Sequence, residues 1–145
     1  MSGDFIDTNV FVYLFDETSP DKQQAALALI QDALALGTAC ISFQVVQETL
    51  NVITRKLKVP VTLEDATQFL EKVLLPLWRV NPSRGLYRRA LDLQGRYGFG
   101  FYDSLILSAA LEAGCSRLLS EDLQDGQRIE GLTIANPFSA IGSDP

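Results

Sequence analysis

Residues 5–10 of the chain, Phe-Ile-Asp-Thr-Asn-Val, join a short apolar run to a polar turn. The apolar part predicts a short buried strand that ends at Asp7, and residues 8–15 are patterned as the helix that follows. An aspartate between a strand and a helix is a good helix N-cap. It also stands where open parallel sheets bind their ligands, outside the carboxyl ends of the strands. Asp7 is therefore the first candidate for a functional residue.

The rest of the chain alternates short apolar runs with helical patterns. Further strands are expected at residues 38–42, 77–80, 117–120 and 132–135. Helices are expected at residues 22–36, 44–58, 62–75, 83–97 and 102–113. This alternation is typical of a parallel sheet that is covered on both faces by helical crossovers. We therefore expect residues 1–145 to form one α/β domain with a mainly parallel sheet of about five short strands.

The composition excludes several catalytic classes, because the chain has no histidine. Ser-His-Asp and Cys-His catalysis, paired-histidine ribonuclease chemistry and His-ligated zinc sites are all ruled out. Cys40 and Cys115 are far apart in the sequence and lie in apolar surroundings, which predicts two reduced thiols in the core. If the protein is an enzyme, its carboxylates must carry the chemistry, together with a hard metal ion bound by oxygen.

The N-terminal residues do not resemble a targeting signal, since they lack a positively charged start followed by a long apolar run. No apolar stretch reaches the roughly 18 residues that a membrane span needs. We therefore expect a soluble, cytoplasmic protein with no membrane contact.

Three aspartates stand at places that a parallel sheet would bring together. Asp7 and Asp122 follow predicted strands, and Asp103 begins a helix that is apolar nearly all round. Each alone is explained as a helix cap worth about 1 kcal/mol. Together at one edge of the sheet they would repel one another unless a cation joined them. Glu48 lies at the edge of the polar face of helix 44–58, where it either faces solvent or borders a groove.

Four motifs occur in order along nearly the whole chain. They are Phe-Ile-Asp7-Thr-Asn9-Val, Gln44-Val-Val-Gln-Glu48-Thr-Leu-Asn-Val-Ile, Phe101-Tyr-Asp103-Ser-Leu-Ile and Leu-Leu-Ser120-Glu-Asp122. Any one of them is weak evidence, but the ordered set resembles the PIN-domain family, and specifically its VapC-type toxins. This resemblance implies a three-layer α/β/α fold and a ribonuclease that depends on Mg²⁺ or Mn²⁺, with one or two ions.

The resemblance also assigns roles to individual residues. The four-acid catalytic and metal-binding site maps onto Asp7, Glu48, Asp103 and Asp122. Asn9 matches the asparagine that supports the first aspartate, and Ser120 matches a hydroxyl beside the metal site. Asp125 is either an additional acid of the site or a turn residue before Gly126, and Glu121 is expected to point to solvent.

The implied chemistry is hydrolysis of a phosphodiester bond. Hard divalent ions prefer carboxylate and water oxygens, activate water near neutral pH and neutralise charge on the phosphate. Asp7, Asp103 and Asp122 would ligate the ion directly or through water, and Glu48 would ligate it or orient the attacking water. In-line attack on phosphorus would leave a 5′-phosphate and a 3′-hydroxyl.

The net charge of −6 does not favour RNA binding, but the charges are unevenly distributed. Residues 55–96 contain nine basic and four acidic residues, whereas the remainder contains three basic and fourteen acidic residues. Arg55 and Lys56 end the helix that bears Glu48, and Arg55 falls nearly on the same face of a regular helix. They either grip RNA phosphates or complement the helix dipole.

The resemblance further implies two protein partners. One is a cognate antitoxin whose C-terminal segment covers the acidic site, and the other is a second copy of the chain. The apolar faces of helices 22–36 and 46–57 would either share surface in a homodimer or belong to the core.

Other functions fit the sequence less well or remain open. A phosphorelay receiver needs a lysine after its last strands, and no lysine follows Lys72. A PIN nuclease that matures RNA without an antitoxin remains an alternative, as does a catalytically silent PIN domain that binds RNA or protein.

Overall fold

The structure, a computed structural model, describes residues 3–141. Its centre is a six-stranded sheet in the order β3-β2-β1-β4-β6-β5. The strands are β1 (Asp4–Ile6), β2 (Ala39–Ser42), β3 (Trp78–Val80), β4 (Arg117–Leu119), β5 (Arg128–Ile129) and β6 (Leu132–Ala135). The predicted domain also includes residues 1–2 and 142–145, which lie outside the described residues.

The predicted α/β class with a mainly parallel sheet is confirmed. All five expected strands are present and pair in parallel. The sheet has one strand more than expected, because β5 pairs antiparallel with β6 at the edge. β5 has only two residues, Arg128 and Ile129, which is too short for a recognisable apolar run.

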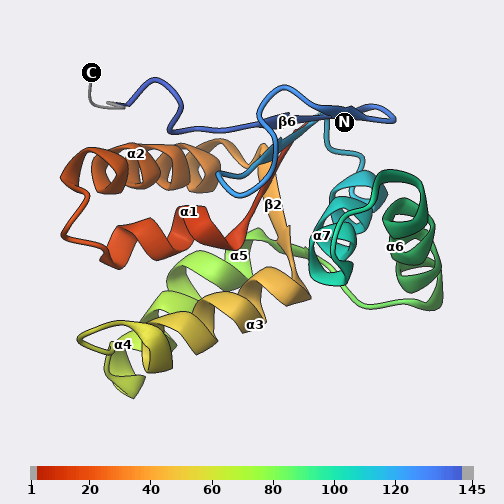
Figure 1. Cartoon of the computed structure of the whole chain (residues 1–145). Helices are drawn as coiled ribbons and strands as arrows, with labels where there is room; N and C mark the ends of the chain where they lie inside the picture. The colour runs from red at the N-terminus through yellow and green to blue at the C-terminus, as the bar shows by residue number, and fades with distance from the viewer. Residues whose placement is uncertain (1–2, 142–145) are drawn as a thin grey trace.

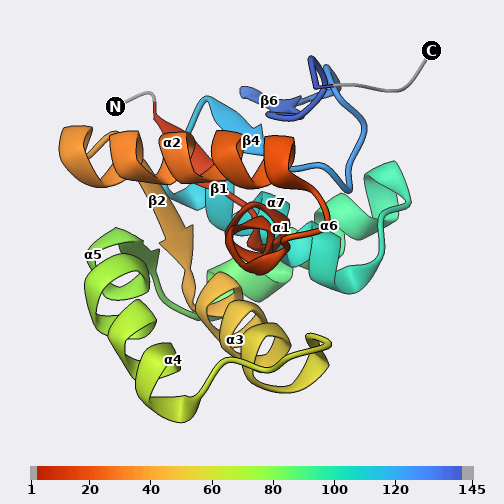
Figure 2. The same cartoon turned by 90° about the vertical axis from the view of Figure 1, so that its left-hand side faces the viewer.

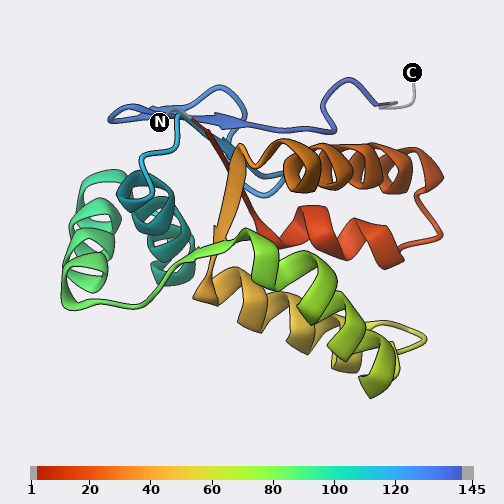
Figure 3. The ribbon, with the colours of Figure 1, turned by 180° about the vertical axis from the view of Figure 1, so that it is seen from behind.

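Helices cover both faces of the sheet. The helices between β1 and β2 are α1 (Thr8–Val12), the 3₁₀ segment η1 (Tyr13–Phe15) and α2 (Pro20–Leu36). The later ones are α3 (Phe43–Asn51), α4 (Leu63–Phe69), α5 (Leu75–Leu77), α6 (Arg84–Tyr97) and α7 (Phe101–Glu112). α1 and α2 lie on one side of the sheet and α6 and α7 on the other (Figures 1 and 3). α3 to α5 form a separate group beyond the end of β2 (Figure 2).

β1 lies in the interior of the sheet, with a strand on either side. Phe5 and Ile6 are fully buried, and β1 pairs in parallel with β2 on one side and β4 on the other. Burying such side chains stabilises a fold by about 1.5–3 kcal/mol each. The apolar start of the quoted segment therefore becomes the centre of the core.

The strand order reverses beside β1. The chain passes from β1 to β2 and β3 on one side, and then crosses α6 and α7 to place β4 on the other side. This is the topological switch at which open α/β sheets form their ligand sites. The backbone N–H of Asp7 donates to the carbonyl of Leu119 at 3.0 Å, so the ends of β1 and β4 are joined there.

The long helix predicted at residues 44–58 is not regular. It begins as α3 but continues from Asn51 as a wider π-helical segment, η2 (Val52–Lys56). The hydroxyl of Thr54 donates to the carbonyl of Leu50 at 2.6 Å within this stretch. Since each π turn takes more residues than an α turn, the faces of η2 are out of phase with those of α3.

The helix predicted at residues 62–75 is interrupted in the same way. Thr62 caps α4 as expected, and its hydroxyl accepts a hydrogen bond from the Asp65 N–H at 3.2 Å. A second π-helical segment, η3 (Leu70–Leu74), then leads into α5. Pro76 lies in α5 and has no N–H to donate to the preceding turn, a common cause of such irregularities.

Two other expectations can be compared with the described residues. Cys40 and Cys115 are free and buried, which confirms the two reduced core thiols. Within residues 3–141, no helix combines the length and the apolar character needed to cross a bilayer.

Replacement of Phe5 tests the central position of β1. We expect Phe5→Ala to lower the free energy of unfolding by about 3–5 kcal/mol, because it leaves a cavity at a fully buried site. The measurement is urea unfolding followed by circular dichroism. Phe5→Leu is the control and should cost less than about 1.5 kcal/mol. Equal small losses for both variants would contradict the packing described here.

Candidate active site

Asp7 is held between the ends of two neighbouring strands. It caps α1, since its Oδ1 accepts the backbone N–H of Thr8 at 2.7 Å. Its Oδ2 accepts the hydroxyl of Ser120, which follows β4, also at 2.7 Å. Asp7 is only 6% exposed. Asp7 is therefore both the N-cap of α1 and a residue at the end of a strand, so the two interpretations considered from the sequence hold together.

Asn9 joins Asp7 to a second acid. Its side-chain N–H donates to Asp7 Oδ2 at 3.4 Å and to Asp122 Oδ2 at 3.2 Å. It also reaches the hydroxyl oxygen of Ser120 at 3.3 Å, while its Oδ1 accepts the Glu121 backbone N–H at 3.2 Å. The amide thus bridges the segments that follow β1 and β4, which is the placement expected of a supporting residue.

Glu48 faces the same cleft and not bulk solvent. Its Oε1 accepts the hydroxyl of Thr8 at 2.7 Å, and its Oε2 accepts the side-chain amide of Gln44 at 3.3 Å. Of the two orientations left open by the sequence, the structure supports the groove. α3 is therefore tied to α1 through a carboxylate.

Gln44 is a site residue that the sequence reasoning did not single out. It is buried, and its amide donates both to Glu48 and to the backbone carbonyl of Tyr102 at 3.1 Å. Tyr102 precedes Asp103 at the start of α7, so Gln44 connects the elements that carry two of the acids. The sequence did contain a signal for this role: Gln44 lies four residues before Glu48, and residues four apart on a helix are neighbours.

The four predicted acids line one cleft of about 860 Å³. They come from four segments of the chain, and the cleft lies at the carboxyl edge of the sheet. The acidic members of its lining are Asp7, Asp16, Glu48, Asp103, Glu121 and Asp122, and the polar members include Thr8, Asn9, Gln44 and Asn51. The four acids singled out in the sequence therefore share one cleft, whose lining also includes Asp16 and Glu121, which the sequence analysis did not place there.

Burial and neighbouring negative charge raise the pKa of two of the acids, Asp7 and Asp103. Burial raises the pKa of Asp7 to about 6, against hydrogen bonds from Ser120 and Thr8 that lower it, and the charges of Asp122 and Glu48 add to the rise. Partial burial and the same two charges raise the pKa of Asp103. Such mutual repulsion is typical of a site that is electrostatically complete only with a cation.

The donor set of the cleft fits a hard divalent ion, since it consists of carboxylate, hydroxyl and amide oxygens. Across residues 3–141, no three acidic or cysteine side chains already stand as a preformed ligand group. Ion binding therefore requires the side chains to close together. Asp103 can move readily, because no hydrogen bond ties its carboxylate to another described residue.

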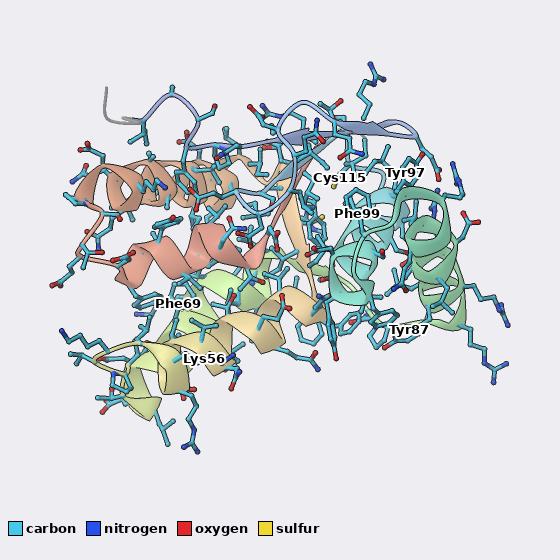
Figure 4. All side chains as sticks on the ribbon, in the orientation of Figure 1. Lys56, Phe69, Tyr87, Tyr97, Phe99 and Cys115 are labelled. Carbon is cyan, nitrogen blue, oxygen red and sulfur yellow. The ribbon has the colours of Figure 1, made fainter. Side chains whose placement is uncertain are left out.

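Three further expectations concern residues beside the cleft. Lys56 lines it, whereas Arg55 is exposed and does not. The prediction that Arg55 shares the face of Glu48 is wrong, because the π-helical segment shifts the following residues around the helix axis. Figure 4 shows Lys56 on the α3 side of the molecule.

Asp125 does not line the cleft. Its Oδ1 accepts the backbone N–H of Asn136 at 2.8 Å, and the next residue, Gly126, has a φ of 85°. Both observations support the turn interpretation of Asp125.

The prediction that Glu121 points to solvent is wrong. Its carboxylate accepts hydrogen bonds from the hydroxyl of Tyr13 and from Lys22, whose Nζ lies 2.7 Å away. Lys22 also lies 5.1 Å from the centre of the Tyr13 ring. This cluster ties the segment after β4, which also carries Asp122, to η1 and α2.

A six-stranded, mainly parallel α/β sheet with an acidic cleft at its switch point is a design shared by many hydrolases and binding proteins. Comparison with protein families identifies the class of this fold, because the PIN domain family model matches residues 5–128. The chain therefore belongs to the PIN domain family. Comparison with curated protein sequences gave no match.

Several solved structures have a similar fold. A chain of DNA-bound VapBC from Salmonella typhimurium is 19% identical, with a TM-score of 0.65 over 94% of this chain and 99% of that chain. A chain of a toxin–antitoxin complex from Klebsiella pneumoniae is also 19% identical, with a TM-score of 0.64 over 93% and 98%. The sarcin-ricin loop cleaving toxin VapC20 of Mycobacterium tuberculosis is 17% identical, with a TM-score of 0.59 over 83% and 92%.

The raised pKa of Asp7 predicts a stability gain when its charge is removed. The Asp7 carboxyl binds a proton more tightly in the folded state than in the unfolded state. The protonated carboxyl therefore favours folding at low pH, and this stability is lost as the pH rises from about 3.8 to about 6. We expect Asp7→Asn, in EDTA, to be about 1–2 kcal/mol more stable than wild type at pH 7.5, after allowing for one lost hydrogen bond.

At pH 4.5 the advantage of Asp7→Asn should disappear, because the folded wild-type carboxyl is then largely protonated. Urea unfolding at the two pH values measures the difference. Asp125→Asn provides a matched control, because Asp125 is exposed and does not line the cleft. An equal stability difference at both pH values would contradict the buried, repelled carboxylate.

Proposed function

We propose that this PIN-domain protein is a metal-dependent endoribonuclease of the VapC toxin type. The observation that carries the proposal is the convergence of Asp7, Glu48, Asp103 and Asp122 on one cleft at the switch point of the sheet. The similar structures support the biological class, because they are VapBC and other toxin–antitoxin assemblies and a sarcin-ricin loop cleaving toxin.

Asp7, Asp103 and Asp122 would hold one or two Mg²⁺ ions, with Mn²⁺ as the alternative. The ion would supply an activated water and neutralise charge at the phosphate. Ser120 and Asn9 keep Asp7 oriented towards the cleft, and Asn9 keeps Asp122 beside it. Asp7 accepts three hydrogen bonds and Asp122 accepts one from Asn9, so both carboxylates keep acceptor capacity for ligation.

Glu48 would orient the attacking water. Thr8 and Gln44 each donate one hydrogen bond to its carboxylate, which fixes the side chain while leaving further acceptor capacity on both oxygens. Attack on phosphorus in line with the 3′-oxygen would give a 5′-phosphate and a 3′-hydroxyl. A 2′,3′-cyclic phosphate product would exclude this route, because it requires attack by the ribose hydroxyl.

We extend the proposal to two protein partners. One is a cognate antitoxin that would cover the acidic cleft, and the toxin–antitoxin complexes named above support a partner of this kind. A second copy of the chain would pack against α2, where Leu27, Leu34 and Leu36 are 45%, 37% and 70% exposed. The apolar face of residues 46–57, which the sequence also offered for a dimer, belongs to the interior of the protein, since Val46 and Ile53 are buried. Measured mass in solution tests the dimer, and a monomer at micromolar concentration would contradict it.

The first experiment is cleavage of total RNA by the purified protein with Mg²⁺, followed by mapping of the ends. We expect EDTA to abolish cleavage and Asp7→Asn or Asp122→Asn to lower the rate at least about 100-fold, because each removes a carboxylate from the ion. Asp125→Asn should retain activity, since its carboxylate lies outside the cleft.

Each result of this experiment has a clear meaning. Equal cleavage by wild type and Asp7→Asn would identify a contaminant or a different site. Absence of cleavage by folded, antitoxin-free protein would favour a silent binding module. Activity without an antitoxin gene beside it would favour the alternative of an RNA maturation nuclease.

Lys56 and Arg55 give a prediction about RNA binding. Lys56 lines the cleft, so we expect Lys56→Ala to weaken binding of catalytically inactive protein to RNA. The slope of log K against log salt should fall by about 1, as for loss of one phosphate contact. Arg55→Ala should have a smaller effect. The control is Lys72→Ala, because Lys72 is exposed and outside the cleft lining. Identical slopes for wild type and Lys56→Ala would remove Lys56 from the RNA footprint.

A further inference from the structure

A second cavity lies at the opposite end of the sheet from the acidic cleft. It has a volume of about 300 Å³ and is bordered by the starts of β1 and β2, including Asp4 and Ala39. Both cysteines of the chain form part of its wall. The exposed residues Arg79 and Glu112 also line it, so the cavity connects the buried thiols with the surface.

The two cysteines lie close together in space although 75 residues separate them. Cys40 lies on β2, and Cys115 lies in the turn between α7 and β4. Their sulfur atoms are 3.7 Å apart and within hydrogen-bonding distance of each other. Figure 4 shows Cys115 near the amino ends of the strands, well away from Lys56.

We propose that Cys40 and Cys115 are a peroxide-reactive thiol pair that closes to an intramolecular disulfide within the folded protein. Cys40 is the thiol that reacts first, and Cys115 resolves the oxidised intermediate. The co-reactant is a small hydroperoxide that enters through the cavity. This site is separate from the acidic cleft, so the proposal does not depend on ribonuclease activity.

The electrostatics of the pair support this order of reaction. The hydrogen bond between the two thiols and the charge of Arg79 lower the pKa of the Cys40 thiol, although burial opposes the shift. The same hydrogen bond and burial raise the pKa of Cys115. Because the thiolate is the nucleophilic form, Cys40 is the sulfur prepared for attack.

Both steps balance in atoms and electrons. The Cys40 thiolate attacks one peroxide oxygen, so an S–O bond forms, the O–O bond breaks and the departing hydroxide takes a proton to become water. The Cys115 sulfur then attacks the Cys40 sulfenic acid, so the S–S bond forms and the S–O bond breaks. A second water leaves with the proton from Cys115. Overall, two thiols lose two electrons and one hydrogen peroxide becomes two waters.

The turn that carries Cys115 allows the necessary movement. The sulfur atoms must approach from 3.7 Å to about 2.05 Å. Gly114, directly before Cys115, has a φ of 73° and ends α7, so the change falls on a turn and not on a strand. The bond would link β2 to the segment that enters β4.

The test treats the folded full-length protein with hydrogen peroxide and then blocks free thiols with a maleimide. We expect both thiols to become protected and mass spectrometry of non-reduced peptides to show a Cys40–Cys115 cross-link. Dithiothreitol should restore both thiols. The oxidised monomer should melt about 5–10 °C higher than the reduced one, because the bond closes a long loop.

Two variants identify the roles of the thiols. Cys115→Ala should accumulate sulfenic acid at Cys40, trapped by dimedone, whereas Cys40→Ala should leave Cys115 largely unmodified. The proposal is overturned if folded wild-type protein keeps both thiols under conditions that cross-link it in urea. It is also overturned if the cross-link forms only between molecules.

Discussion

The parallel pairing of β1 with β4 is the contact on which the acidic cleft depends. Phe5 lies opposite Leu118 and Ile6 opposite Leu119, so both strands end at the same level. This register places Asp7 beside Ser120, and Asn9 then reaches Asp122. A slip of one residue would turn the side chains to opposite faces and separate these groups. The buried apolar side chains therefore fix the positions of the polar ones.

The cleft is stabilised by hydrogen bonds and destabilised by its own charge. Asp7 accepts bonds from Ser120, Asn9 and Thr8, and Glu48 accepts bonds from Thr8 and Gln44. These contacts set the orientation of the carboxylates, but burial and mutual repulsion still raise the pKa of Asp7. A folded protein that keeps such a cluster sacrifices stability for it, which is typical of sites where a ligand provides the missing charge.

The sequence predicted the secondary-structure elements well and singled out acids that the fold brings to one cleft, because both have local signals. Apolar runs mark the strands, and Asp7, Asp103 and Asp122 stand at their ends or at a helix start. The residues it missed depend on contacts between distant segments. Glu121 was assigned to solvent because its partners, Tyr13 and Lys22, come from the other end of the chain.

The sequence also did not predict which side chains of residues 52–56 face the cleft, because it gives no sign that the helix becomes π-helical there. Of the two basic residues expected there, Arg55 and Lys56, only Lys56 lines the cleft. β5 was missed because two residues carry no pattern.

The chain order of the cleft has a consequence for biosynthesis. Asp7, Glu48 and Asp103 emerge before Ser120 and Asp122, which follow β4. Since domains generally fold as units, β1 cannot complete its pairing until residues 117–119 have been synthesised. A nascent or truncated chain that stops before β4 therefore lacks both the hydroxyl that anchors Asp7 and the fourth acid.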